Sequence, residues 1–138
     1  MIMVRVFVDT GIFVSVLNRE ARYEYAAKFL KKVANREIDA FISVVTLSEI
    51  LSIYSRINEK EAVAAKTYIE SIFGEDRILP ILKDTAEIAG KIKAKNKMSL
   101  GDSFIVASAI EIGCDYVVSL DSEIKNQNMI KTKTPDAL

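Results

Sequence analysis

Apolar and polar residues follow one another along the chain in short segments of two kinds. Five short runs are rich in β-branched and aromatic residues, as is typical of strands, and they fall at residues 4–8, 40–44, 77–82, 116–119 and 129–132. Six further segments place apolar residues at helical spacing, at residues 12–17, 23–34, 45–57, 60–73, 84–95 and 103–112. Strands separated by helices favour a parallel sheet, because parallel neighbours need long crossovers. The pattern therefore predicts an α/β fold of three layers, α/β/α, around a central parallel sheet.

Capping residues stand at the expected starts of several helices. Asp9 or Thr10 can cap the helix that follows the first strand, and Asp121 can cap a short helical turn after the fourth. Ser99 opens a Ser-x-x-Asp capping box with Asp102, ahead of a helix that is apolar on most sides. These residues indicate where the connections between strands begin and end.

The chain of 138 residues has the usual size of one domain, and no internal repeat or flexible linker divides it. We expect a single domain over residues 1–138. The apolar run at residues 1–8 is broken by Arg5 and ends at Asp9, so it is too short for a membrane span or for the core of a signal peptide. We expect no association with a membrane.

The amino-acid composition limits which catalytic groups and metal sites the chain can have. The chain has no histidine, which excludes Ser-His-Asp and Cys-His nucleophiles and the common zinc sites. The single cysteine, Cys114, cannot form an intramolecular disulfide, which fits a reducing cytoplasm. The 19 basic and 19 acidic residues cancel, so a polyanionic partner would need local basic patches or a metal ion. Catalysis would have to use carboxylates, lysines or hydroxyls.

Four acids stand where a parallel sheet places ligands. Asp9 and Asp121 follow the ends of two predicted strands, and ligands bind at the carboxyl ends of such strands. Asp102 lies in the first turn of one largely apolar helix, and Glu49 lies within another. Taken singly, Asp9 and Asp121 can be plain caps, Asp102 the acid of a capping box and Glu49 a solvated glutamate. Their expected convergence at one edge of the sheet favours a shared site.

Clustered carboxylates require a counter-charge. A close pair repels by about 4 kcal/mol at an effective dielectric constant near 20, so a hard cation is needed to hold several together. A site built only of oxygen ligands selects Mg²⁺ or Mn²⁺. Such a site can activate water and stabilise the charge that develops during displacement at a phosphodiester. This chemistry needs no histidine.

Four short motifs occur in order along the chain: Val8-Asp9-Thr10, Thr46-Leu47-Ser48-Glu49-Ile50, Leu100-Gly101-Asp102-Ser103-Phe104-Ile105-Val106-Ala107 and Ser119-Leu120-Asp121. Together they resemble the PIN-domain nucleases, and above all the small VapC-type toxins of type II toxin–antitoxin pairs. The resemblance covers essentially the whole chain. It implies a five-stranded parallel sheet, a homodimer, a cognate antitoxin protein, and Mg²⁺- or Mn²⁺-dependent cleavage of single-stranded or loop RNA, such as tRNA, rRNA or mRNA.

The resemblance also assigns roles to individual residues. It makes the catalytic and metal-binding acids Asp9, Glu49, Asp102 and Asp121. Thr10 and Ser119 match hydroxyl residues that orient carboxylates or water by hydrogen bonds. The sequence departs from the usual pattern after Thr10, where a glycine replaces a small polar residue.

Basic and aromatic residues suggest further contacts. Two groups of lysines can position a phosphate backbone: Lys91, Lys93, Lys95 and Lys97, and Lys125, Lys131 and Lys133. Lysines spaced by twos spread around a helix, so a solvated helix face is the alternative. Tyr23, Tyr25 and Phe29 can form a groove for an antitoxin helix, or simply belong to the core.

Three other functions are compatible with parts of the pattern. A receiver-type phosphoacceptor domain also has an acidic pocket at the end of a parallel sheet, but it needs a pair of acids after the first strand, and Asp9 stands alone. A PIN nuclease of RNA maturation or quality control has the same domain sequence features as a toxin, and gene context separates the two. A catalytically silent PIN scaffold would be expected to lack one of the acids, and none is missing.

Overall fold

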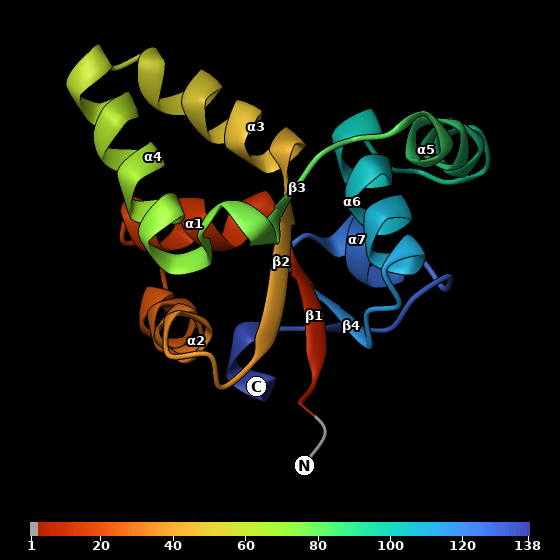
Figure 1. Cartoon of the computed structure of the whole chain (residues 1–138), viewed down its shortest axis with the longest axis horizontal. Helices are drawn as coiled ribbons and strands as arrows, with labels where there is room; N and C mark the ends of the chain where they lie inside the picture. Colours follow the sequence, from red (N-terminus) through yellow and green to blue (C-terminus); the bar gives the residue numbers. More distant parts are fainter. Residues whose placement is uncertain (1–2) are drawn as a thin grey trace.

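The centre of the computed structural model is a parallel sheet of five strands in the order β3-β2-β1-β4-β5 (Figure 1). The structure describes residues 3–138, so the first two residues of the expected domain lie outside it. The strands are β1 (Arg5–Val8), β2 (Asp39–Ser43), β3 (Ile78–Leu79), β4 (Tyr116–Val118) and β5 (Thr132–Lys133). The predicted parallel α/β class and the expected number of strands are both confirmed.

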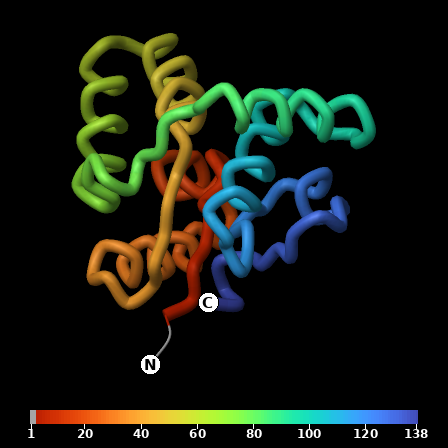
Figure 2. The backbone as a smooth tube through the Cα atoms, turned by 45° about the vertical axis from the view of Figure 1, so that its right-hand side comes forward, coloured from red at the N-terminus to blue at the C-terminus, as the bar shows by residue number. Residues whose placement is uncertain are grey.

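Helices cover both faces of the sheet, as the three-layer prediction requires. They are α1 (Thr10–Leu17), α2 (Tyr23–Ala34), α3 (Val44–Ser55), α4 (Glu59–Phe73), α5 (Lys83–Lys95), α6 (Leu100–Glu111) and α7 (Ser122–Asn126). In Figures 1 and 2, α1 to α4 lie on one side of the sheet and α5 to α7 on the other. A final helical turn, Pro135–Ala137, returns to α2. Within the described residues, no helix is both long and apolar enough to span a bilayer.

Two hydrophobic cores form because successive strand residues point to opposite faces. Val6 and Val8 of β1 lie in the core shared with α1 to α4, whereas Phe7 lies in the core shared with α5 to α7. In β4, Val118 and Val117 divide in the same way. Both faces of the central strands are therefore buried from solvent, which explains why these strands are continuous apolar runs.

The helix boundaries agree with the sequence pattern more closely than those of the edge strands. The strand predicted at residues 77–82 is shorter in the structure, where β3 is Ile78–Leu79. The last edge strand, predicted at residues 129–132, is β5 (Thr132–Lys133), which shares only Thr132 with the prediction. Residues 127–130 instead form a loop organised by one side chain. Gln127 Oε1 accepts hydrogen bonds from the amides of Met129 and Ile130, and Gln127 Nε2 donates to the Ile130 carbonyl.

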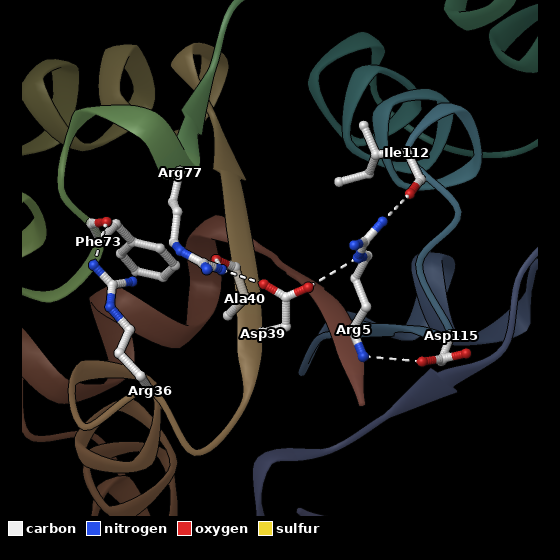
Figure 3. A network of polar contacts seen from close by, with 8 residues as sticks. All are labelled: Arg5, Arg36, Asp39, Ala40, Phe73, Arg77, Ile112 and Asp115. Atoms are coloured by element: carbon white, nitrogen blue, oxygen red, sulfur yellow. Dashed lines mark hydrogen bonds and ion pairs between the residues drawn. The ribbon is translucent and has the colours of Figure 1, made fainter. Parts of the chain in front are cut away.

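A polar network ties together the amino-terminal ends of three strands (Figure 3). Asp39 accepts hydrogen bonds from Arg5 Nε at 2.9 Å and from Arg77. Arg5 also donates to the Ile112 carbonyl at 2.9 Å, at the end of α6. Burial alone would raise the pKa of Asp39, but the hydrogen bonds and charges of both arginines outweigh it and hold the pKa below its ordinary value. This network lies at the end of the sheet opposite the acids Asp9 and Asp121.

Candidate active site

Neighbouring strands bring the first and last predicted acids together. Asp9 comes directly after β1, and Asp121 follows β4 by three residues. The two strands are adjacent, with Val8 paired to Val118, and the Asp9 amide donates to the Val118 carbonyl at 3.0 Å. Carboxyl ends of adjacent parallel strands share one edge, so these acids meet where such sheets bind ligands.

Asp9 occupies the capping position of α1 but does not cap it with its side chain. Its carboxylate accepts a hydrogen bond of 2.8 Å from Ser119 Oγ, and Asp9 is only 4% exposed. The structure thus decides against the cap reading of this side chain. Its partner lies 110 residues away along the chain, beyond the reach of any local sequence rule.

Ser119 links Asp9 to Asp121. While donating to Asp9, Ser119 Oγ accepts a hydrogen bond from the Asp121 amide at 2.9 Å. Asp121 is the cap of α7 that the sequence predicted, and its Oδ1 accepts from the amides of Glu123 and Ile124. Both capping bonds use one carboxylate oxygen, so Asp121 combines the role of a cap with a place at the rim of the site.

Thr10 fixes the position of Glu49. Thr10 Oγ1 donates to Glu49 Oε1 at 2.7 Å, and its other contact is Thr46 Oγ1 at 3.0 Å. Because the Thr10 proton is directed to the carboxylate, Thr46 is the donor in the second bond. Glu49 is half-buried, and its Oε2 would lie 3.1 Å from a Cβ placed on Gly101. It is therefore packed against the first turn of α6 and is not a freely solvated side chain.

Asp102 comes from that first turn. Ser99 Oγ accepts a hydrogen bond from the Asp102 amide at 3.1 Å, so Ser99 caps α6 as predicted. The Asp102 carboxyl lines an open pocket of about 330 Å³ at the carboxyl end of the sheet. Its lining residues are Asp9, Thr10, Gly11, Val14, Glu20, Asp102, Leu120 and Asp121. Glu49 lies behind this wall, held by Thr10.

The pocket contains one acid that the sequence analysis missed. Glu20 belongs to the loop between α1 and α2. The loop folds back through left-handed conformations at Arg19 (φ 48°) and Arg22 (φ 64°), and the Glu20 amide donates to the Ser15 carbonyl at 2.9 Å. No periodicity or cap motif predicts such a turn.

Burial and mutual repulsion make the acids poor anions in the absence of a cation. Desolvation raises the pKa of Asp9 from 3.8 to about 7, opposed by the Ser119 hydrogen bond and assisted by the charges of Asp102 and Asp121. Desolvation also raises the pKa of Asp102 from 3.8 to about 6, with further increases from Asp121 and Glu49. Asp102 and Asp121 thus act electrostatically on Asp9, and Asp121 and Glu49 on Asp102.

The donor set suits a hard divalent cation, because every polar side chain that lines the pocket offers oxygen. Within residues 3–138, however, no three of the acids are gathered closely enough to hold one ion together. Asp9, Asp102 and Asp121 line the same pocket, whereas Glu49 is engaged by Thr10. Binding an ion would therefore draw the carboxylates inward from these positions.

A family model for the PIN domain matches residues 6–128 of the sequence. The chain belongs to the PIN-domain family. The matched region of this PIN domain begins in β1 and ends beyond α7, so it includes all four predicted acids. PIN domains are nucleases, which agrees with the acidic pocket described above.

Solved structures from Neisseria gonorrhoeae, Rickettsia felis and Mycobacterium tuberculosis have the same fold. FitAcB from Neisseria gonorrhoeae is 20% identical, with a TM-score of 0.74, covering 96% of this chain and 99% of that one. VapBC2 from Rickettsia felis, bound to promoter DNA, is 15% identical, with a TM-score of 0.72 and coverages of 94% and 98%. Mycobacterium tuberculosis VapC20, a toxin that cleaves the sarcin–ricin loop, is 20% identical, with a TM-score of 0.69 and coverages of 87% and 92%. No curated protein sequence matches this PIN domain significantly.

Proposed function

We propose that this PIN domain is a Mg²⁺- or Mn²⁺-dependent endoribonuclease whose catalytic acids are Asp9, Glu49, Asp102 and Asp121. The observation that supports the proposal is that Asp9, Asp102 and Asp121 line one pocket at the carboxyl end of the sheet, while Thr10 holds Glu49 next to it. The buried Asp9 supports the proposal most strongly, because its side chain does not cap α1 but accepts a hydrogen bond from Ser119 at the pocket. A carboxylate buried in this way is costly unless a cation compensates it.

The proposed role of each acid follows from its position relative to the pocket. Asp9, Asp102 and Asp121 face the pocket and are the proposed metal ligands, with Glu49 as the fourth acid behind Thr10. When bound, a divalent cation supplies Lewis acidity that activates water and neutralises charge on phosphodiester oxygens. Asp9 must lose its proton to bind it, and Ser119 then fixes the orientation of the carboxylate.

Thr10 gives Glu49 a defined position as well. Its hydroxyl holds one carboxylate oxygen, while the other faces the first turn of α6 near Asp102. Orienting bonds of this kind are worth roughly 10- to 100-fold in metal affinity or activity. Thr10 and Ser119 are therefore proposed as positioning residues, with no direct contact to the reacting phosphate.

RNA is the proposed substrate, and a toxin of a type II pair the proposed biological role. One solved structure of this fold is a toxin–antitoxin complex from Klebsiella pneumoniae, and VapC20 is described as a toxin that cleaves the sarcin–ricin loop. On this basis we also propose a cytoplasmic protein of a single domain that forms a homodimer and binds a cognate antitoxin. A short antitoxin gene next to this one would support the toxin role over RNA maturation.

Cleavage of labelled RNA by the purified protein tests the enzymatic proposal. The wild type should cut in Mn²⁺ or Mg²⁺ and not in EDTA, and Asp9→Asn and Asp102→Asn should abolish cutting. Asp84→Asn is the matched control, because Asp84 is an exposed aspartate in the first turn of α5, just as Asp102 is in the first turn of α6. Equal cutting by all four proteins would refute the proposal.

A further inference from the structure

A second pocket opens beside the acidic one. It has a volume of about 220 Å³, and it shares Leu120 with the acidic pocket, so this side chain borders both pockets. Its walls come from the start of α2, from α7 and from the carboxyl-terminal segment. The residues that line it are Ala21, Arg22, Tyr25, Ala26, Leu120, Lys125, Thr134, Pro135 and Asp136. None of the four predicted acids belongs to it.

The chemistry of this second pocket differs from that of the first. It presents two cations, Arg22 and Lys125, and the ring of Tyr25, which is 48% exposed. The Arg22 guanidinium lies 4.9 Å from the centre of the Tyr25 ring and 3.6 Å from Asp136 Oδ2. Arg22 also has a left-handed backbone, which non-glycine residues rarely adopt. The fold therefore holds a cation and an aromatic face together next to the acidic site.

We propose that this pocket is a subsite for the nucleotide next to the scissile phosphate of a single-stranded RNA. The inference rests on the proposed ribonuclease function and names how its substrate is held. An exposed aromatic ring offers a stacking surface that every base can use, and the neighbouring cations attract the phosphate backbone. Thr134 and Asp136 add polar groups within reach of a base edge or a ribose hydroxyl.

The negative charge of the acidic pocket explains why an RNA nuclease needs a cationic pocket beside it. The first pocket is lined by Asp9, Asp102, Asp121 and Glu20, which repel a polyanion until a cation neutralises them. The chain as a whole carries no net positive charge to offset that repulsion. Arg22 and Lys125, partly offset by Asp136, leave the second pocket with one net positive charge beside the acids, where a flanking phosphate would lie.

The subsite combines two features that the sequence presented separately. The aromatic stripe divides in the structure: Phe29 is in the core, whereas Tyr25 lines the pocket. Of the basic groups, Lys125 lies at the end of α7 and reaches the same pocket. Tyr23 packs with Arg19, at 5.9 Å from guanidinium to ring centre, and does not line the pocket. It therefore provides a matched control for Tyr25.

Binding of a fluorescein-labelled oligouridylate to the full chain, measured by anisotropy in EDTA, tests the subsite without cleavage. Tyr25→Leu should weaken binding about 5- to 160-fold, the range for loss of one stacked base. Lys125→Gln should make the plot of log affinity against log salt shallower by about 0.7, the value for one phosphate contact to a single strand. Tyr23→Leu and the exposed Lys60→Gln on α4 should bind as the wild type does.

Photocrosslinking with 4-thiouridine in the same RNA gives an independent readout, with the adduct expected on Tyr25 and absent from Tyr23. Wild-type affinity in both Tyr25→Leu and Lys125→Gln would overturn the proposal and leave the pocket to a peptide partner. Failure of the nuclease proposal is distinguishable: the wild type would then bind RNA in EDTA with the predicted Tyr25 dependence, yet cut nothing in Mn²⁺.

Discussion

Replacing Asp9 with asparagine should stabilise the metal-free protein, and increasingly so as the pH rises. The Asp9 carboxyl has a pKa of about 7 in the folded chain, against 3.8 for an unperturbed group. Above pH 4 the unfolded chain loses this proton while the folded chain retains it, so the stability present at low pH is lost as the pH rises through 7. Asparagine has no proton to lose.

The difference in pKa sets the magnitude. About three pKa units at 1.36 kcal/mol each amount to roughly 4 kcal/mol at pH 8, and to only about 1.5 kcal/mol at pH 5. Asparagine also changes the hydrogen bond with Ser119, but that cost is independent of pH over this range. The gain of Asp9→Asn over the wild type should therefore grow by about 3 kcal/mol between pH 5 and pH 8.

Urea unfolding followed by circular dichroism in EDTA measures this difference at each pH. A gain that stays constant between pH 5 and pH 8 would refute the reasoning, because it would mean that the buried carboxyl titrates normally. Adding Mn²⁺ at about 100 times its dissociation constant should then stabilise the wild type by about 2.7 kcal/mol and leave Asp9→Asn nearly unchanged.

Four further substitutions give distinct outcomes. Ser119→Ala should lower metal-dependent cleavage about 10- to 100-fold by releasing its two partners, as steady-state rates would show. Gly101→Ala, whose Cβ would lie 3.1 Å from Glu49 Oε2, should lower cleavage without lowering the melting temperature, whereas Gly90→Ala, with nothing within 4 Å, should only stabilise, by about 0.5–1 kcal/mol. Asp39→Asn should cost about 1–3 kcal/mol in urea unfolding at pH 7, a loss that shrinks as the pH falls and the wild-type carboxyl is protonated, with cleavage unaffected.

Most of the fold could be predicted because its helices and central strands bury continuous apolar faces. The helix α2 (Tyr23–Ala34) has the predicted bounds, and β1 differs from its prediction by one residue. The edge strands carry less information, since each pairs over only two residues. At residues 127–130, the backbone forms hydrogen bonds with the Gln127 side chain and not with a neighbouring strand. The pattern of hydrophobic residues contains no sign of these bonds.

The candidate site could be predicted in its residues but not in its contacts. The motifs identify Asp9 and Ser119 separately, yet only the pairing of β1 with β4 joins them in a hydrogen bond. Capping rules consider only neighbouring residues and therefore predict that Asp9 is a helix cap, because they do not include a partner 110 residues away. Glu20 enters the pocket through left-handed turns, and Tyr25 and Lys125 meet only after α7 has packed near α2. Each of these depends on tertiary structure.

Anomalous diffraction from crystals grown with Mn²⁺ tests most directly whether the acidic pocket is a metal site. The wild type should show an anomalous peak bordered by Asp9, Asp102 and Asp121, and crystals of Asp9→Asn should lack it. A peak only elsewhere on the molecule, or none at a Mn²⁺ concentration that supports RNA cleavage, would contradict the assignment of these carboxylates to metal-dependent catalysis.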